Sequence, residues 1–248
     1  MAKKNNFSID FFIAHRGASA LGPENTISSM ILAKRYGSKW IEVDVRLSKD
    51  SEVIVFHDDN LLRLANTNQL VIEKDYKELA SYDVGLWFDK SFKGETIPTL
   101  IDVIKFCNEN KVNLNIEIKS DQGLAHLISC KVQKIINDYW SFKENMLISS
   151  FQLEALEKIV EGKKLKRMLL LDKFEKNDLL ESNISQFSYI GLDSKKTDKP
   201  TIDFLLKKRK KILIYTVDDL VTAEKLKSWG VTAIFSNFPK DLIKSKKS

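Results

Sequence analysis

The sequence has no apolar run close to the ~20 residues that a transmembrane helix needs, so we expect no membrane span. It has only two cysteines, Cys107 and Cys130, and their spacing fits neither a metal site nor a redox motif. We therefore expect both to be reduced thiols in the core. Basic strands interleaved with aromatic residues are also missing, which disfavours nucleic-acid binding.

The composition is that of one soluble globular domain. The 248 residues are 43% hydrophobic and 30% charged. This length suits a single domain, residues 1–248, of the size of one eight-stranded barrel. The net charge of +6 and the lysine-rich segments 207–211 and 244–248 favour a solvated surface over one that steers anionic substrates or touches anionic lipid.

The N-terminus imitates a secretory signal only in part. Its apolar core, residues 11–14, is shorter than the ~7 to 15 residues of such signals, and Asp10 precedes it. Cleavage at the small residues that follow would also discard His15 and Arg16. We therefore expect a cytoplasmic protein.

Eight short apolar runs rich in β-branched residues recur along the chain, and helical patterns follow them. The runs are residues 10–15, 40–46, 114–119, 146–150, 167–171, 189–193, 212–217 and 233–236. The helical patterns include residues 26–36, 124–139, 153–160 and 220–229. This alternation predicts parallel strands with right-handed crossovers, and eight such units close into an α/β fold, the (β/α)8 TIM barrel.

Two segments fall outside this rhythm. Residues 53–57 form a further apolar run only about six residues after the second strand, so an antiparallel or irregular strand is expected. Residues 60–95 include a helical pattern at 75–82, and aromatic residues such as Trp87 stand among polar residues there. We interpret them as a small cap insertion over the barrel mouth, whose aromatic residues contact a ligand or pin the insertion to the barrel.

Charged residues stand where the first strand ends. His15 and Arg16 close the apolar run, and Gly17 follows, which permits a backbone turn that other residues disfavour. Asn25 or Thr26 can cap the helix that comes next. This pattern places His15 and Arg16 at a strand-to-helix corner, where α/β proteins handle small anionic ligands.

Acidic residues alternate with apolar residues in two other strands. Glu42 and Asp44 share one face of the second strand, because strand side chains repeat every two residues. Glu117 and Lys119 share the corresponding face of the third strand. Carboxylates that point together into a barrel repel each other, and a hard divalent ion is the simplest way to relieve that repulsion.

Each of these features alone has a plainer explanation. An acidic pair on a strand is more often a solvated face, and a histidine at a strand end is more often structural. Together they favour a functional site, because polar residues recur on one face of strands that otherwise look buried. Two of the three histidines, His15 and His57, also lie at strand ends.

Seven short motifs follow one another along the chain. They are His-Arg-Gly at 15–17, Pro-Glu-Asn-Thr at 23–26, Glu-Val-Asp at 42–44, Val-Phe-His-Asp at 55–58, Ile-Pro-Thr-Leu at 97–100, Glu-Ile-Lys at 117–119 and Ile-Ser-Ser-Phe at 148–151. In this order they resemble the glycerophosphodiester phosphodiesterase family, from about residue 12 to residue 239. Several motifs in order are more specific than any one of them.

The resemblance implies metal-dependent hydrolysis of glycerophosphodiesters to sn-glycerol 3-phosphate and an alcohol. Glu42, Asp44 and Glu117 would bind one divalent cation, Mg²⁺ or Ca²⁺, since their oxygen ligands suit hard ions. Arg16, as a two-pronged donor, and Lys119, as a point charge, would neutralise the phosphate.

His15 and His57 would form the catalytic acid/base pair. An imidazole pKa near 6.5 lets one be neutral and the other protonated near pH 7. Either the glycerol 2-hydroxyl attacks the phosphorus first and gives a cyclic phosphate, or water attacks directly. The sequence leaves both routes open, and it leaves open which histidine is the base.

Phe151, Tyr215 and Trp87 are the candidates for the substrate pocket. Tyr215 and Asp218 depart from the Trp and Asn that the family usually has, and Asp218 is expected to add negative charge near the pocket mouth. One alternative is a lysophospholipid phosphodiesterase of the lysophospholipase D kind, with an apolar landing surface at the cap. A non-catalytic phosphodiester-binding protein is the other. We expect a small-molecule substrate and a monomer or homodimer.

Overall fold

The computed structural model describes residues 7–141, 143–175 and 178–238. Its parallel strands are β1 (Phe12–Ala14), β2 (Trp40–Leu47), β4 (Asn113–Ile118), β5 (Met146–Ser150), β6 (Leu165–Leu171), β7 (Tyr189–Asp193), β8 (Lys211–Tyr215) and β9 (Ala233–Ser236). Each strand pairs with the next, and β9 pairs with β1, so the sheet closes. The predicted eight-stranded parallel barrel is confirmed.

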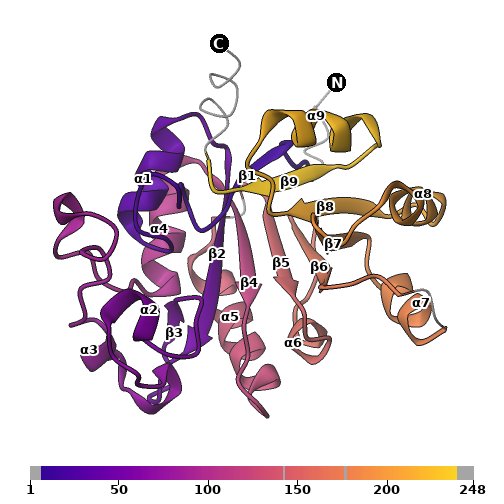
Figure 1. The fold of residues 1–248 in the computed structure, drawn as a ribbon. Coiled ribbons are helices and arrows are strands. Elements are labelled where there is room, and N and C mark those ends of the chain that lie inside the picture. Colours follow the sequence, from indigo (N-terminus) through magenta and orange to yellow (C-terminus); the bar gives the residue numbers. More distant parts are fainter. Residues whose placement is uncertain (1–6, 142, 176–177, 239–248) are drawn as a thin grey trace.

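Helices surround the strands in Figure 1. They are α1 (Ile27–Arg35), α4 (Leu100–Asn110), α5 (Ala125–Tyr139), α6 (Glu154–Glu157), α7 (Asp178–Ser185), α8 (Lys199–Lys207) and α9 (Leu220–Ser228). The prediction of a helix over residues 153–160 is too long, because the Val160 N–H donates to the Gln133 side chain instead of a helical carbonyl. No helix in the described ranges is both long and apolar enough to cross a membrane.

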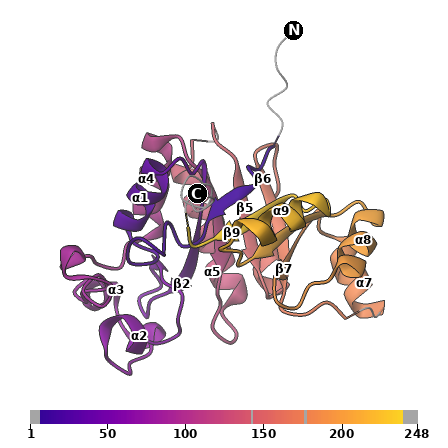
Figure 2. The same ribbon diagram turned by 45° about the horizontal axis from the view of Figure 1, so that its top comes forward.

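The insertion after β2 has its own small core. It begins with β3 (Val53–Val55), which pairs antiparallel with β2 and so confirms the expectation from the short link. It continues through α2 (Leu62–Ala65), the 3-10 turn η1 (Val71–Glu73), α3 (Tyr76–Leu79) and the 3-10 turn η2 (Lys90–Phe92). Its buried residues are Ile54, Phe56, Leu61, Leu64, Val71, Leu79, Val84 and Ile97. In both views α2 and α3 lie on the opposite side of the barrel from α7 and α8 (Figures 1 and 2).

The barrel interior and the barrel wall use alternate residues of each strand. On β2, Ile41 and Val43 pack in the large cluster between strands and helices, whereas Trp40 belongs to a separate interior cluster. That interior cluster also contains Ile13, Leu147, Met168, Leu170, Leu213, Ala233 and Phe235. Glu42 and Asp44 therefore share the inner face with Trp40, as the period of two predicts.

The two cysteines have different surroundings. Cys107 on α4 is buried, but Cys130 on α5 is exposed, so the prediction that both are core thiols is wrong for Cys130. The buried face of α5 carries Ile128, Val132 and Ile136. These positions repeat at four-residue spacing, and residue 130 lies on the opposite face of such a helix.

Candidate active site

The corner after β1 is set by backbone geometry and by Gly17. Gly17 has a φ of +82°, and a Cβ at this position would lie 2.3 Å from the Ser29 Oγ on α1. Only glycine fits this close approach. The turn lets the Arg16 N–H donate to a Glu42 carboxylate oxygen at 2.8 Å. This hydrogen bond joins the end of β1 to the inner face of β2.

The sequence left open whether Asn25 or Thr26 caps the helix after β1, and in the structure the two residues have different roles. Thr26 caps α1, since its side chain accepts a hydrogen bond from the Ser29 N–H. Asn25 instead contacts Asp44: its Nδ2 donates to Asp44 Oδ2 at 2.9 Å, and its Oδ1 accepts from the Asp44 N–H at 3.1 Å. Asn25 thus fixes the orientation of one of the three predicted metal-binding carboxylates.

Three carboxylates converge at the carboxyl ends of β2 and β4. One oxygen from each of Glu42, Asp44 and Glu117 lies within 4.8 Å of the others. Glu42 and Asp44 are 2% and 1% exposed, and the oxygens Glu42 Oε1 and Asp44 Oδ1 have no hydrogen-bond partner among the described residues. Unpartnered buried oxygens are costly, and oxygen-only ligand sets suit hard cations, so this triad can hold a metal ion.

Positive side chains flank the triad. Arg16 Nε lies 3.2 Å from Asp44 Oδ2, and Lys119 Nζ lies 2.6 Å from Glu117 Oε1 and 3.5 Å from Asp44 Oδ1. Burial alone would raise the pKa of Asp44, but Arg16 and Lys119 hold it below its usual range. Burial and then Asp44 and Glu117 raise the pKa of Glu42 well above its ordinary value. Two cations therefore leave one of three carboxylates uncompensated, which also fits a site for a further cation.

His15 is held in one tautomer by Asn237. The His15 Nδ1 lies 2.7 Å from Asn237 Oδ1, and the amide nitrogen of Asn237 donates to Asp218 Oδ2 at 2.6 Å. Because an amide oxygen only accepts, Nδ1 must carry the proton, and the lone pair is on Nε2, 3.9 Å from Glu42. Burial and the Arg16 guanidinium lower the pKa of His15 to about 4. Asp218 orients this amide, whereas the sequence had suggested added charge at the pocket mouth.

His57 follows β3 and is more accessible than His15. Its Nδ1 lies 2.6 Å from Asp58 Oδ1, and the two side chains are 30% and 21% exposed. Burial, and then the Arg16 and Lys119 charges, lower the pKa of His57 in spite of the nearby Asp44 carboxylate. The antiparallel strand β3, which the sequence could not place relative to the site, is what carries this histidine to the barrel mouth.

One pocket of about 140 Å³ unites most of the predicted residues. Its lining comprises His15, Arg16, Glu42, His57, Asn115, Glu117, Lys119, Ser149, Phe151, Leu170, Tyr215, Thr216 and Phe235. Asp44 lies behind this surface and reaches it through its contacts with Arg16 and Lys119. The pocket therefore presents the predicted catalytic, metal-binding and phosphate-binding groups to one small ligand.

The predicted substrate-pocket residues separate into two groups. Phe151 and Tyr215 line the pocket and pack edge to face, with ring centroids 5.8 Å apart. Trp87 is absent from the pocket lining; its indole N–H donates to the Val84 carbonyl, and its ring packs on Phe88 at 5.6 Å. These contacts stay within the insertion, so they join Trp87 neither to the pocket nor to the barrel, and its side chain is 42% exposed.

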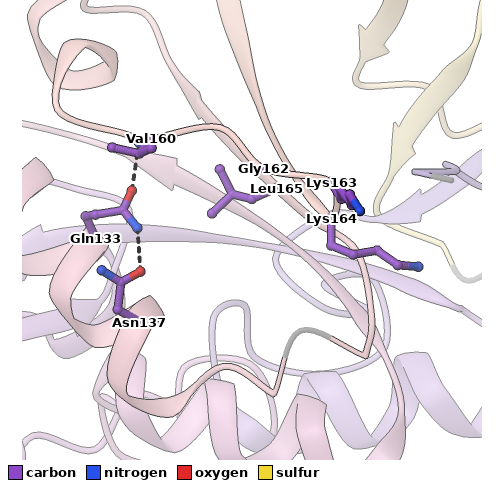
Figure 3. Close-up of a pocket in the computed structure, with 7 residues that line it drawn as sticks. All are labelled: Gln133, Asn137, Val160, Gly162, Lys163, Lys164 and Leu165. Atoms are coloured by element: carbon purple, nitrogen blue, oxygen red, sulfur yellow. Dashed lines mark hydrogen bonds between the residues drawn. The ribbon is translucent and has the colours of Figure 1, made fainter. Parts of the chain in front are cut away.

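A larger cavity of about 490 Å³ lies elsewhere, between α5 and the segment that leads into β6. Figure 3 shows Gln133 there, bonded to the Val160 backbone and to Asn137. Its lining, which also includes Gly162, Lys163, Lys164 and Leu165, contains no histidine and no carboxylate. Size alone therefore does not locate the chemistry in this molecule, whereas the convergence of titratable groups does.

Several residues of the site were not among the predicted site residues. Asn115 and Ser149 line the pocket, and Asn115 Nδ2 donates to Ser149 Oγ at 2.9 Å. Asn237 contacts His15 from 222 positions away in the chain. Arg63 in the insertion was not a predicted site residue either, but it contacts both Glu24 and Asp58. The alternation on β4 could have identified Asn115, which shares a strand face with Glu117.

Comparison with known proteins agrees with this geometry. Residues 15–241 match the glycerophosphoryl diester phosphodiesterase family. The protein YhdW of Bacillus subtilis (strain 168) is 31% identical over 241 residues, which cover 96% of this chain and 98% of YhdW. A glycerophosphodiester phosphodiesterase of Caldanaerobacter subterraneus subsp. tengcongensis is 39% identical over 147 residues, covering 59% of this chain and 60% of its own.

A solved structure is similar over nearly the whole chain. It is a phosphodiesterase of Oleispira antarctica in complex with the product sn-glycerol-3-phosphate. The two chains are 29% identical, the TM-score is 0.88, and 96% of each chain is covered.

Proposed function

The chain belongs to the glycerophosphoryl diester phosphodiesterase family and is a glycerophosphodiester phosphodiesterase, which releases glycerol 3-phosphate; we propose that it does so with one bound divalent cation and two histidines. The observation that carries this proposal is the pocket that two imidazoles, two cationic side chains, Glu42 and Glu117 line, with Asp44, the third member of the acidic triad, directly behind it. In phosphodiester hydrolysis the imidazoles can transfer protons and the cationic groups can stabilise negative charge.

The acidic triad would hold the cation. Glu42, Asp44 and Glu117 supply only oxygen ligands, which favours Mg²⁺ or Ca²⁺ over zinc. Glu42 Oε1 and Asp44 Oδ1, which accept no hydrogen bond from the described residues, are the atoms left available for it. When bound, such an ion supplies Lewis-acid stabilisation of negative charge on the phosphate.

Arg16 and Lys119 would bind and orient the phosphate. Both side chains are 17% exposed and held by carboxylates, so their charges are fixed before the substrate enters. Burial opposes the charge of Lys119, but Glu117 and Asp44 raise the pKa of Lys119 above its ordinary value. Fixed cations of this kind stabilise developing charge without having to reorganise during the reaction.

His15 and His57 would move the protons. The neutral His15 presents the Nε2 lone pair toward the pocket and accepts a proton there from the attacking hydroxyl or water. His57 would donate a proton to the departing alcohol oxygen, and Asp58 stabilises its protonated ring. The cyclic-phosphate route and the direct-water route place the same demands on these two side chains in the first step. The cyclic-phosphate route then needs a second step, in which His57 would accept a proton from water and His15 would return its proton to the glycerol 2-oxygen.

The decisive experiment measures glycerol 3-phosphate released from glycerophosphocholine. The wild-type protein is assayed with EDTA and after Mg²⁺ or Ca²⁺ is added back, beside folded His15→Ala and Glu42→Ala variants. Metal-dependent release that both substitutions abolish supports the proposal. Release that is unaffected by EDTA and by Glu42→Ala would refute the metal role, and full activity of His15→Ala would refute the histidine role.

A lysophospholipid substrate is the second candidate. Leu86 and Trp87 on the insertion are 48% and 42% exposed, and Phe151 at the pocket is 44% exposed, so an acyl chain could contact apolar side chains there. Lysophosphatidylcholine is therefore assayed in parallel. Cleavage of it by a protein that is inert toward glycerophosphocholine would move the substrate assignment to lipid. If the protein cleaves neither diester but binds sn-glycerol 3-phosphate, it is a binding protein.

A further inference from the structure

Arg63 is an insertion residue that contacts two carboxylates beside the active site at once. It lies on α2, outside the barrel wall, and its guanidinium forms bidentate pairs on two edges. Nη1 and Nη2 donate to the two oxygens of Glu24 at 2.7 and 2.8 Å. Nε and Nη2 donate to the two oxygens of Asp58 at 2.8 and 3.1 Å. Paired bonds of this kind fix orientation as well as charge.

Both carboxylates that Arg63 holds also hold active-site side chains. Glu24 Oε1 accepts a hydrogen bond from Arg16 Nη1 at 2.8 Å. Asp58 Oδ1 lies 2.6 Å from the His57 Nδ1. A continuous chain of side-chain contacts thus runs from Arg16 through Glu24, Arg63 and Asp58 to His57, and Arg63 joins its two halves.

We propose that Arg63 is a positioning residue, which couples the orientation of the phosphate-binding Arg16 to that of the catalytic His57. The inference rests on the proposed function, because it assigns Arg63 a role in that same site. Arg63 itself does not line the pocket. It acts by keeping Glu24 and Asp58 in place, and through them the cation on one side of the substrate and the imidazole on the other.

The burial of Glu24 and the exposure of Arg63 explain why the contact between them matters for catalysis. Glu24 is 9% exposed, so a rotation of its carboxylate away from Arg63 would leave a nearly buried charge with fewer partners. Arg63 is 43% exposed, and solvent screens its charge but does not replace its geometry. We therefore expect loss of Arg63 to change catalysis far more than it changes the stability of the fold.

The same insertion contains a matched control. Lys74 Nζ donates to Glu78 Oε1 at 2.7 Å, four residues along the chain, and this ion pair has no link to the pocket lining. Lys74→Ala removes a cation from the insertion just as Arg63→Ala does. It should leave turnover within about twofold of wild type, because exposed pairs of this type contribute little.

The test compares Arg63→Ala, Arg63→Lys and Lys74→Ala in the holoenzyme with glycerophosphocholine as substrate. We expect Arg63→Ala to lower kcat/KM about a hundredfold, since small displacements of reacting groups have effects of that size. Millimolar guanidinium should restore part of the loss, and equal sodium chloride should not. Arg63→Lys should stay well below wild type, because an ammonium group cannot hold both carboxylates in two-point contact.

Two readouts do not depend on turnover. Calorimetric titration with sn-glycerol 3-phosphate should show weaker binding to Arg63→Ala, and the His57 imidazole resonances should shift in this variant but not in Lys74→Ala. If the wild-type protein hydrolyses no diester, the proposed function is wrong. The binding and resonance measurements still test whether Arg63 couples Arg16 to His57. The coupling is refuted if Arg63→Ala keeps turnover within threefold, if Arg63→Lys restores it fully, or if binding and the His57 resonances are unchanged.

Discussion

Trp40 and Glu42 lie two residues apart on the same face of β2, yet they belong to opposite halves of the barrel interior. Trp40 is fully buried in the apolar half. There the centroid of the Phe7 ring lies 5.9 Å from that of Trp40 and 5.5 Å from that of Tyr189. Glu42 is just as inaccessible but faces two other carboxylates and a pocket. The comparison shows that stability and chemistry are divided along the barrel axis, within single strands.

Glu42→Gln gives the largest expected effect on the chemical half. The substitution keeps the shape but removes a ligand charge, so we expect the turnover rate to fall about a thousandfold, the upper end for loss of one electrostatic group. The free energy of unfolding should not decrease, because one of three crowded buried carboxylates is gone. Steady-state kinetics and urea unfolding measure the two quantities. A destabilised protein with normal turnover would reverse the comparison.

Trp40→Ala is the matched change in the apolar half. Removing this buried ring should cost about 3–5 kcal/mol of unfolding free energy, the range for such truncations. The fraction that remains folded should keep a kcat within a few fold of wild type, since the pocket lining is unchanged. Unfolding is followed by circular dichroism, with assays below the midpoint. If folded protein lost activity as Glu42→Gln does, the two halves would not be separable.

The pH dependence of the unfolding free energy, measured without metal, sharpens the comparison between Glu42 and Trp40. The folded-state pKa of Glu42 is raised above the ordinary value of 4.5, so the folded protein binds this proton more tightly than the unfolded chain. The resulting stabilisation is complete at low pH and is lost as pH rises from about 4.5 through the raised pKa. Each unit of pKa difference corresponds to about 1.4 kcal/mol.

In EDTA, the unfolding free energy of wild type minus that of Glu42→Gln should therefore fall as the pH rises from about 4.5 through the raised pKa of Glu42. Trp40→Ala shows no such trend relative to wild type, because no titrating group is removed. Urea unfolding at several pH values provides the measurement, and a difference that stays constant with pH would contradict the raised pKa of Glu42.

The smallest expected effect lies outside the barrel interior. Burial raises the pKa of the Cys107 thiol, whereas Cys130 is exposed on α5. A thiol reagent should therefore label Cys130 rapidly and Cys107 only after denaturation. Cys130→Ser should change the unfolding free energy by less than about 0.5 kcal/mol and leave turnover unchanged. Rapid labelling of both thiols in the folded protein would show that the helical layer opens easily.

Local periodicity made much of this fold predictable. The alternation around Glu42 and Asp44 placed both on one strand face, and the short link before Val53 predicted an antiparallel or irregular strand, because each rule acts over a few residues. The exposure of Cys130 was missed because composition says which residues prefer the core, whereas the helix phase decides each case.

The supporting contacts of the site could not be predicted in this way. Asn237 and His15 are 222 residues apart, and no pattern along the chain records which distant side chains become neighbours. In the insertion the aromatic Trp87 attracted attention, whereas Arg63 makes the contacts that reach the site. A charged residue in a polar segment looks the same in sequence whether it faces water or a second carboxylate.

The closure of the barrel has a consequence for redesign. β1 and β2 share one strand pairing, Ala14 with Ile41, whereas β2 and β4 share six. The polar contacts that cross this seam include those of the Arg16 backbone with Glu42, of the Arg16 guanidinium with Asp44 and of Asn25 with Asp44. The same side chains therefore fasten the barrel and prepare the chemistry. A designer who moves this site to another scaffold has to move the seam with it, and one who erases the site should expect faster amide exchange along β1.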